Sequence, residues 1–408
     1  MRILYFHQHF ATPQGAGGTR SYEFARALIA RGHQVTLVCG AHAQSGLQLP
    51  WDAQQGWSRG DVAGIDVISL PLAYANRDSL LRRAWVFTRF AWRSLQLALT
   101  KPYDLAFATS TPLTAALPGL AAKWLAGKPF VFEVRDLWPE LPRALGVRNP
   151  LLLGGMSVLE WSAYHAADAC IGLAPGIVAG IAARAPAGQT IALIPNGSDL
   201  DLFHPRLRAP LQLPGLQSGD FVAGFTGAHG PANGLTALLA VAQELQRRGD
   251  QRIKLVFIGD GKEKDTLRQA AAQAGLTNCL FFDPVPKAQL GALTASFDCG
   301  LMVLKNVPAF YHGTSPNKFF DYAAAGIPII NNYPGWLAEI ITQTGAGLVV
   351  PPDNPEAFAD ALQALAADPV RCQSAGRAAR ALAEQRFARA DLADRFVTTL
   401  ETVAAQQL

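Results

Sequence analysis

The sequence predicts an α/β protein of two facing Rossmann-like domains with a cleft between them. Its 408 residues are too many for one ordinary domain core and comfortable for two. Half of the residues are hydrophobic and only 16% are charged, so the chain can fill such cores, and this composition excludes a disordered protein. Strand-like and helix-like segments alternate in two series, separated by a proline-bearing linker near residue 200. Such alternation is typical of parallel sheets covered by helices.

The first series begins with a strand, a glycine-rich turn and a helix. The apolar run Arg2–Phe6 predicts the strand, Gly15–Gly18 the turn, and a helix starts near Thr19 and ends at Gly32. The β-branched run Gln34–Cys39 predicts the next strand and completes a βαβ unit. Further strands are expected at Val67–Leu70, Leu105–Ala108, Phe130–Val134, Ala169–Gly172 and Thr190–Ile194, and helices at Leu113–Leu125 and Leu151–Ala166.

The second series restarts the same alternation after Gly219. Phe221–Phe225 predicts a strand, Gly227–Gly234 a glycine-rich loop, and Leu235–Arg247 a helix. The remaining strands are expected at Lys254–Ile258, Leu280–Phe282, Cys299–Val303, Pro328–Asn331 and Gly347–Val350, and the remaining helices end at Ala274 or cover Asn317–Ala325, Pro355–Ala366 and roughly Ala375–Leu400. We therefore expect one domain over residues 1–198, a second over 199–385, and a helix over 386–408 that returns toward the first domain.

Charge and cysteine content narrow the class of protein. The net charge of +4 is too small for a dedicated nucleic-acid binder, yet it suits anionic small substrates or an anionic membrane surface. The five cysteines are far apart and never in CxxC spacing, which disfavours disulfides and zinc and predicts buried free thiols. The first residues do not resemble a signal peptide, and no uninterrupted apolar run reaches about 18 residues. We expect a cytoplasmic protein.

The strongest chemical signal lies between Gly313 and Tyr322. Ser315 followed by Pro316 is typical of a helix cap and first turn, which leaves backbone N–H groups free to bind an anion. Lys318 adds a positive charge in the same turn, and Asp321 follows it by three positions on the same side of the helix. A diphosphate would meet Lys318, and the two ribose hydroxyls would meet Asp321. An ordinary capped helix with a Lys–Asp surface pair is the alternative.

Several segments together resemble one enzyme family. SPNKFFDYAAAGIPII, FIGDGKEK and PNGSDLDLF resemble family four of the GT-B glycosyltransferases, and GAGGTRSYEFARAL, FEVRDLWPE and GAHGPANGL resemble its bacterial O-antigen and capsule branch, which is WbuB-like. The resemblance covers essentially the whole chain. It implies retaining transfer of a hexose or N-acetylaminosugar from a nucleoside-diphosphate sugar, preferably UDP-linked, held in the cleft mainly by the second domain. It also implies no cofactor, no metal, and a saccharide or polyprenyl-diphosphate-linked acceptor used in cell-surface polysaccharide synthesis.

The chain departs from the family pattern at its acidic residues. Many relatives place two glutamates eight positions apart, and here the second position is Asp321 while the first is Gly313. The carboxylate that approaches the donor sugar is therefore missing. Thr314, Ser315 and the backbone amides through Asn317 are the candidates to replace it, and whether the missing glutamate alters activity stays open.

A second departure follows the first strand of the second domain. The family's Arg and Lys positions are occupied by Ala228 and Asn233, so His229 and the amides from Gly227 onward are the candidate phosphate donors. Lys318 should then matter more to donor binding. The resemblance also places Val285, in the loop Pro284–Pro286, against the nucleotide base.

The first domain offers further candidates for the reaction. Helix amides at Gly17 and Gly18 would stabilise charge on the leaving phosphate. Arg135 and Asp136 follow a strand, where loops line the crevice of open α/β sheets, and relatives often have a His–Asp pair there. We expect Arg135, Asp136 and Lys318 as catalytic residues. A structural Arg–carboxylate pair is an equally weighted alternative for the first two.

Two weaker signals favour structural roles. Asp199-Leu200-Asp201 has the DxD form of metal-dependent glycosyltransferases, but caps or linker contacts are the expected explanation, and no metal is expected. His7 and His9 follow the first strand, where acceptor contact is conceivable and a packed histidine is favoured.

The segment Ser79–Leu99 predicts a basic amphipathic helix. One face repeats at spacings of four and three and contains Leu81, Trp85, Thr88, Trp92, Leu95 and Leu99. A neighbouring face contains Arg82, Arg89, Arg93 and Gln96. Two interpretations remain open: peripheral contact with the inner surface of the cytoplasmic membrane, or a helix packed on its own domain with a solvated basic side.

Three other functions fit parts of the pattern. A sugar-nucleotide epimerase can share the double fold, and a non-catalytic sugar-nucleotide-binding subunit would explain the missing glutamate. A nicotinamide-dependent oxidoreductase would need GxGxxG after the first strand, and this spacing is absent.

Overall fold

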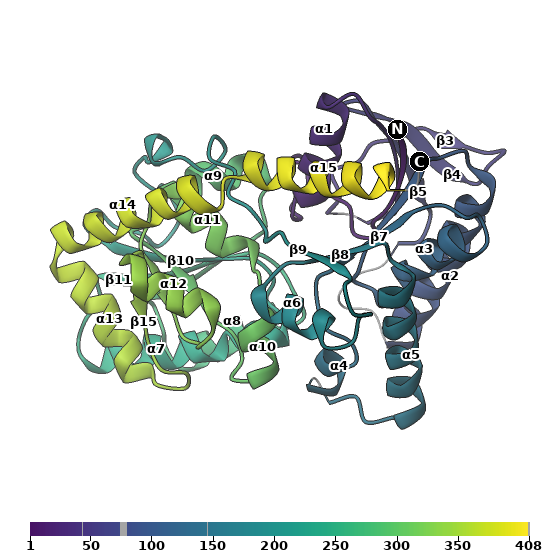
Figure 1. Cartoon of the computed structure of the whole chain (residues 1–408). Coiled ribbons are helices and arrows are strands. Elements are labelled where there is room, and N and C mark those ends of the chain that lie inside the picture. The colour runs from purple at the N-terminus through teal and green to yellow at the C-terminus, as the bar shows by residue number, and fades with distance from the viewer. Residues whose placement is uncertain (43, 74–79, 145, 407–408) are drawn as a thin grey trace. The chain divides into compact units, whose positions relative to one another are not determined.

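The computed structural model describes residues 1–42, 44–73, 80–144 and 146–406, and the chain forms two compact α/β units (Figure 1). The first unit comprises Met1–Pro195, His312–Ser315 and Ala390–Leu408, and the second comprises Asn196–Tyr311 and Pro316–Arg389. The predicted two-domain α/β class is confirmed. Within the described ranges, no helix is both long and apolar enough to span a bilayer.

The first unit is built on one mixed sheet with the strand order β3-β4-β5-β2-β1-β6-β7-β8-β9. Its strands are β1 (Arg2–Phe6), β2 (Gln34–Gly40), β3 (Trp51–Asp52), β4 (Trp57–Val62), β5 (Ile65–Leu70), β6 (Leu105–Thr109), β7 (Phe130–Val134), β8 (Ala169–Gly172) and β9 (Thr190–Leu193). Its helices are α1 (Arg20–Ala30), α2 (Leu80–Thr100), α3 (Ala116–Trp124), which a 3₁₀ turn at Leu113–Ala115 precedes, α4 (Glu140–Ala144), α5 (Pro150–Ala166), α6 (Pro175–Ala182) and α15 (Arg389–Ala405). The pairs β3–β4 and β4–β5 are antiparallel, and the other neighbours are parallel.

The second unit has a fully parallel sheet with the strand order β12-β11-β10-β13-β14-β15. Its strands are β10 (Phe221–Thr226), β11 (Ile253–Ile258), β12 (Cys279–Phe282), β13 (Cys299–Met302), β14 (Ile329–Asn331) and β15 (Gly347–Val349). Its helices are α7 (Thr236–Arg247), α8 (Lys264–Gln273), α9 (Lys287–Ala295), α10 (Pro308–Gly313), α11 (Asn317–Ala325), α12 (Trp336–Thr344), α13 (Pro355–Ala367) and α14 (Pro369–Arg386), with 3₁₀ turns at Pro205–Leu207 and Pro231–Asn233.

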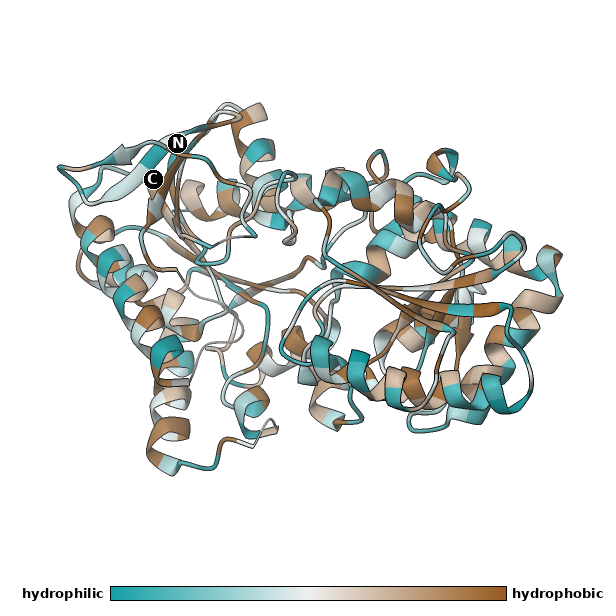
Figure 2. Ribbon diagram, turned by 180° about the vertical axis from the view of Figure 1, so that it is seen from behind, coloured by the Kyte–Doolittle hydropathy of each residue, from teal (hydrophilic) through white to brown (hydrophobic). Residues whose placement is uncertain are grey.

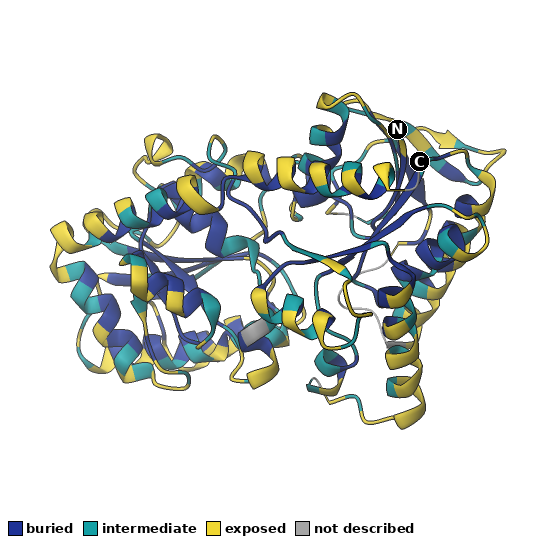
Figure 3. Ribbon diagram, viewed as in Figure 1, coloured by how far each residue is buried: buried dark blue, intermediate teal, exposed yellow. Residues whose placement is uncertain are grey.

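Apolar strands form the centre of each unit. The central strands of both sheets are mostly brown in Figure 2 and dark blue in Figure 3, so these hydrophobic segments are also among the most buried ones. In the first unit α15 completes the core, because the Phe396 ring stacks on Phe24 with centroids 4.6 Å apart and meets Phe107 edge-on at 4.9 Å. The free cysteines are buried at Cys39, Cys170, Cys279 and Cys299 and half-buried at Cys372, close to the prediction of buried thiols.

The structure differs from the predicted elements in two regions. No strands were predicted between residues 51 and 62, where β3 and β4 form an antiparallel hairpin. The single helix expected over Ala375–Leu400 is two helices, because Phe387 and Ala388 leave the helical path. Ala388 pairs there with Ser198 in a short parallel bridge, and this long-range pairing overrides the local helix propensity.

The strand order fixes where a ligand site can form in each unit. In open parallel sheets ligands bind beyond the carboxyl ends of the strands, where the strand order reverses. The reversal lies between β10 and β13 in the second unit and between β1 and β6 in the first. The loops after these strands contain many of the residues that the sequence singled out.

Candidate functional site

Lys318 lies at the reversal point of the second sheet. Its Nζ lies 3.9 Å from the centre of the Phe225 ring on β10 and donates to Oδ1 of Asn233 at 3.1 Å. Asn233 in turn donates from Nδ2 to the carbonyl oxygen of Ala228 at 2.7 Å, which ties the lysine to the loop after β10. Burial lowers the pKa of Lys318 to about 7. The structure therefore joins Lys318 with the predicted Gly227–Gly234 loop.

Helix α11 covers Asn317–Ala325, as predicted, but its cap differs from the prediction. Pro316 occupies the cap position with an extended backbone (ψ 132°) and makes no side-chain cap hydrogen bond. The predicted cap at Ser315 is wrong, because Pro316 lies outside the first turn instead of inside it. Tyr322 holds the helix in place, since its hydroxyl accepts from the backbone N–H of Thr226 at 3.0 Å. The cap residue offers no side-chain acceptor to the first N–H groups of α11, which lie in the same turn as Lys318, and such groups can bind an anion.

His229 is buried at the centre of the same loop. Its ring lies among Phe225, Phe257 and Phe281, and in the described part of the chain neither ring nitrogen has a hydrogen-bond partner. Burial, and then the charge of Lys264, lower the pKa of His229 to about 4, so the ring is neutral at pH 7. A neutral buried imidazole without partners keeps one donor and one acceptor available.

Two glycines let the loops after β10 and β11 touch. A Cβ at Gly259 would overlap the carbonyl oxygen of Gly227, and one at Gly261 would lie 2.5 Å from the carbonyl oxygen of His229. The backbone N–H of His229 also donates to the carbonyl of Asp260 at 2.9 Å. These contacts fix the loop that presents His229 and Asn233.

Asp321 is placed differently from the predicted ribose contact. Nζ of Lys287 donates to both of its carboxylate oxygens, at 2.8 and 2.7 Å, and both side chains are only 5% exposed. Burial raises the pKa of Asp321 and Lys287 opposes the rise. The ribose contact stays a prediction. It would require a carboxylate oxygen of Asp321 to accept from a ribose hydroxyl as well as from Lys287. Sequence reasoning missed Lys287, although the residue directly follows the Pro284–Pro286 loop that it singled out.

The other donor-side candidates are divided between the two units. Val285 is partly buried and packs against the apolar core of the second unit. Thr314 and Ser315 group with the first unit, whereas Pro316, Asn317, Lys318 and Asp321 group with the second. Gly17 is half-buried and Gly18 exposed in the turn before α1, whose cap residue Thr19 makes no side-chain cap hydrogen bond.

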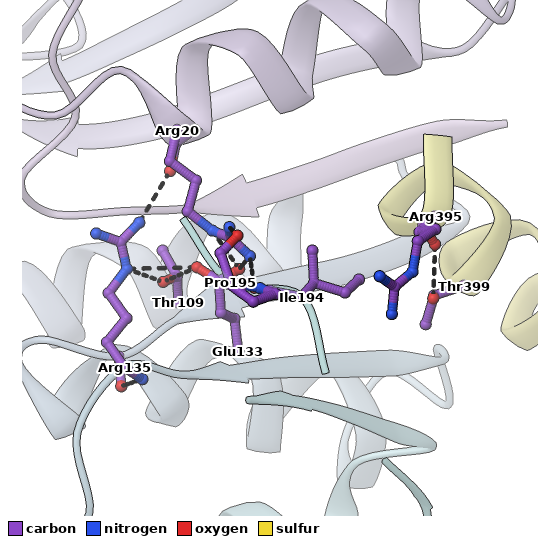
Figure 4. A network of polar contacts seen from close by, with 10 residues as sticks. Arg20, Thr109, Glu133, Arg135, Ile194, Pro195, Arg395 and Thr399 are labelled. Carbon is purple, nitrogen blue, oxygen red and sulfur yellow. Dashed lines mark hydrogen bonds and ion pairs between the residues drawn. The ribbon is translucent and has the colours of Figure 1, made fainter. Parts of the chain in front are cut away.

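A charged network occupies the carboxyl edge of the first sheet (Figure 4). Arg20 donates from Nε and Nη2 to Oε2 of Glu133 at 2.9 and 2.7 Å, and both side chains are at most 2% exposed. Burial alone would raise the pKa of Glu133, but Arg20 and Arg135 hold it below its usual value. Arg135 donates from Nε to the Thr109 hydroxyl at 2.8 Å, and its side chain is 23% exposed. Glu133 therefore anchors Arg135 at the sheet edge.

Asp136 lies beside this network without joining the ion pair. Its carboxylate accepts from the Thr111 hydroxyl at 3.0 Å, and burial raises its pKa. Arg135 thus has its carboxylate partner in Glu133, which sequence reasoning did not select. Glu133 was readable as the charged last-but-one residue of an otherwise apolar strand.

Histidines gather near Arg135. Burial, followed by the charge of Arg135, lowers the pKa of His7 well below its usual value, and burial with His42 lowers that of His9 to about 3. The His42 ring contacts the carbonyl oxygen of Phe10 at 2.9 Å. At pH 7 these rings are neutral, so the local positive charge belongs to the arginine.

The DxD segment forms no metal centre in the described residues, where no group of three or more His, Cys, Asp or Glu side chains gathers. Asp199 instead pairs with Nε of Arg389, whose Nη2 donates to the carbonyl of Gly197 at 2.6 Å. Asp201 is exposed.

Comparison with known proteins identifies both halves of the chain. Residues 15–197 match the glycosyl transferase 4-like domain, and residues 212–382 match the glycosyl transferases group 1. A putative colanic acid biosynthesis glycosyl transferase, WcaI of Escherichia coli K12, is 24% identical over 341 residues, which cover 80% of this chain and 82% of WcaI.

Solved structures agree on the fold. Sucrose-phosphate synthase from Thermosynechococcus elongatus superposes over 100% of both chains with a TM-score of 0.79 and 19% identity. Anabaena HepE in complex with UDP-glucose covers 98% of this chain and 100% of its own with a TM-score of 0.69 and 17% identity. The chain is therefore a group 1 glycosyltransferase of the two-domain GT-B fold.

Proposed function

We propose that the chain transfers a sugar, with retention of anomeric configuration, from a nucleoside-diphosphate sugar to a saccharide or polyprenyl-diphosphate-linked acceptor in cell-surface polysaccharide synthesis. The proposal includes UDP as the nucleotide, an O-antigen or capsule role, and reaction in the cytoplasm. The name of WcaI supports the polysaccharide pathway, and the UDP-glucose complex of HepE supports the donor class.

The observation that carries the proposal is the position of Lys318. A half-buried amine with neutral partners lies in the first turn of α11, at a helix start whose cap residue makes no side-chain hydrogen bond. A diphosphate would supply the missing negative charge, and its binding would restore the protonated form of the lysine. The neutral His229 ring and the amides from Gly227 onward would add hydrogen bonds in the same loop.

The proposed reaction needs positioning and charge stabilisation more than a strong base. The bond between the sugar and the diphosphate breaks as the acceptor oxygen attacks the same face, and the leaving phosphate oxygen takes the acceptor proton. Lys318 and the amides of α11 would stabilise the charge that develops on the leaving group. In the first unit, Arg135 is positioned by Glu133 and would bind an anionic or hydroxyl group of the substrates. Asp136 follows it in the sequence, and the amides of Gly17 and Gly18 precede Arg20, the other arginine that contacts Glu133.

The test begins with thermal-shift measurements against a panel of nucleotides and nucleotide sugars. We expect stabilisation by uridine diphosphate sugars, followed by transfer to a lipid-linked acceptor in a product assay. Conversion of the donor sugar without an acceptor would indicate an epimerase instead. Donor binding with no product in any assay would indicate a binding subunit, and selective stabilisation by a nicotinamide cofactor would overturn the class.

A further inference from the structure

Three adjacent helices of the first unit expose large apolar side chains to solvent. Helix α3 packs against both α2 and α5, so the three form one layer (Figure 1). We call their exposed tryptophans and aliphatic neighbours the tryptophan face. Its tryptophans are Trp85 and Trp92 of α2, Trp124 at the end of α3, and Trp161 of α5. A soluble domain rarely exposes so many large apolar side chains in one layer without a binding role.

The packing of α2 shows which of its sides faces the domain and which faces solvent. Leu81, Trp85, Trp92 and Leu99 lie within about 40° of one another around the helix at 100° per residue. They are 85%, 54%, 61% and 45% exposed. The buried side of α2 is a different one, formed by Val86, Phe90 and Leu97. The leucine–tryptophan stripe is therefore not the side that packs on the domain.

Helix α5 extends this surface and has an unusual composition. Leu151, Val158 and Trp161 are 86%, 66% and 54% exposed. Its one acidic residue, Glu160, is buried and accepts from Nη1 of Arg184 at 2.6 Å, and the helix contains no Lys or Arg. The water-facing side of α5, yellow in Figure 3, thus contains no Asp, Glu, Lys or Arg. A helix that faces only water normally has charged residues there.

The charges that flank the tryptophan face are positive. Arg82, Arg89 and Arg93 are exposed on the side of α2 next to the stripe, and α2 contains no acidic residue. The guanidinium of Arg89 lies 4.9 Å above the Trp85 ring. Apolar side chains bordered by arginines match a membrane interface, where rings and aliphatic groups enter the headgroup boundary and guanidiniums contact lipid phosphates.

We propose that the tryptophan face is a docking surface for an anionic phospholipid bilayer, with the helices lying along the interface. The exposed apolar stripe requires a partner with an apolar interior, and the arginines beside it require a partner with negative charge on its surface. This inference is independent of the proposed reaction, because binding to vesicles requires neither donor nor acceptor. It would bring the first unit to the surface where lipid-linked saccharides reside.

The test uses the full-length protein and sedimentation with lipid vesicles. We expect binding to vesicles of phosphatidylglycerol and phosphatidylcholine in equal parts, and binding weaker by about tenfold or more to phosphatidylcholine alone. Added salt should weaken the first interaction because the arginine charges are screened. Absence of binding to the anionic vesicles would overturn the proposal, and equal binding to both vesicles would overturn its electrostatic part.

Matched variants separate the tryptophan face from other exposed groups. Trp85→Ser with Trp92→Ser should abolish sedimentation, whereas Trp51→Ser, which removes a 57% exposed tryptophan on β3, should leave it unchanged. Arg82→Gln with Arg89→Gln should reduce binding to anionic vesicles by roughly fivefold per arginine, whereas Arg252→Gln in the second unit should not. Circular dichroism verifies that each variant is folded.

Sedimentation velocity in the absence of lipid distinguishes the competing occupant. If the protein forms a dimer that the Trp85/Trp92 variant dissociates, and vesicles are not bound, the face serves self-association and the membrane proposal fails. A monomer that binds anionic vesicles supports the proposal.

Discussion

Lys287, which is buried, and Lys318, which is half-buried, are two lysines of the second unit that contact different partners. Nζ of Lys287 meets both carboxylate oxygens of Asp321 between α9 and α11. Nζ of Lys318, at the start of α11, meets an amide oxygen of Asn233 and the face of Phe225. Across the residues that the structure describes, no carboxylate is recorded within ion-pair distance of Lys318.

The difference between these partners indicates that Lys287 has a structural role and that Lys318 binds a ligand. A buried amine that is paired with a carboxylate already has its counter-charge, so Lys287 and Asp321 compensate each other where α9 packs on α11. A partly buried amine with only neutral partners is destabilised in its charged form, so Lys318 gains from a bound anion. The same helix therefore has a structural charge in its middle and a binding charge at its start.

The loss of the carboxylate in the Lys287–Asp321 ion pair should have the strongest effect on stability. Asp321→Ala leaves Lys287 buried without its partner and should lower the free energy of unfolding by about 3–5 kcal/mol. Chemical denaturation measures this loss. Lys287→Met with Asp321→Leu should recover most of it, because two apolar groups replace the two charges. A stable single variant that loses only donor affinity would instead establish the ribose role of Asp321.

Removal of the Lys318 amine should weaken donor binding without lowering the stability of the fold. Lys318→Ala removes a hydrogen bond from a charged group to the donor, worth about 1.5–3 kcal/mol, so affinity for a uridine diphosphate sugar should fall by roughly 10- to 150-fold. The free energy of unfolding should stay constant or rise. Isothermal titration calorimetry is the measurement, with Lys254→Ala on β11 as the control. Unchanged donor affinity would remove Lys318 from the site.

The ionisation of Lys318 should make both stability and donor affinity depend on pH. Its folded-state pKa of about 7 lies below the usual value of 10.5, so between these values the unfolded chain binds more protons. Its contribution therefore makes stability rise with pH from about 7 to 10.5, by up to about 1.4 kcal/mol per unit. Donor affinity should fall over the same window, because the free amine loses the charge that binds the diphosphate. Both slopes should be absent in Lys318→Met, and parallel slopes in the two proteins would refute the assignment.

The smallest expected effect concerns His229. Replacing the ring by Phe fills similar space without two buried unpartnered nitrogens, and should stabilise the second unit by about 1 kcal/mol. Donor affinity should fall if the ring bonds the diphosphate. Thermal denaturation with and without nucleotide separates the two effects. A destabilised variant would show that the ring already has a partner in the protein.

The sequence predicted well the elements whose signal is local. Short, mainly apolar runs located β1, β7 and β8 to the residue, and α11 was predicted as Asn317–Ala325, as observed. The hairpin of β3 and β4 escaped because its residues are mostly polar. The break at Phe387 and Ala388 escaped because neither residue disfavours a helix, and the pairing with Ser198 is visible only in three dimensions.

The sequence predicted which loops contribute residues to the candidate site, but it did not predict the ion pairs there. Lys318, Asn233 and His229 were selected from one glycine-rich loop and one helix start, and the structure joins these two segments. Lys287 and Asp321 are 34 positions apart, and Arg20 and Glu133 are 113 apart. Such pairings depend on which strands and helices become neighbours, and the sequence does not show this.

The packing of α15 has a consequence for the order in which the protein matures. The ribosome releases β1 and α1 first, yet Tyr5, Phe24 and Phe107 are covered by Phe396 near the other end of the chain. At roughly 5–20 residues per second, tens of seconds separate the two events. The domain that is begun first is thus finished last, and a nascent chain interrupted before residue 390 presents an open apolar core to chaperones and proteases.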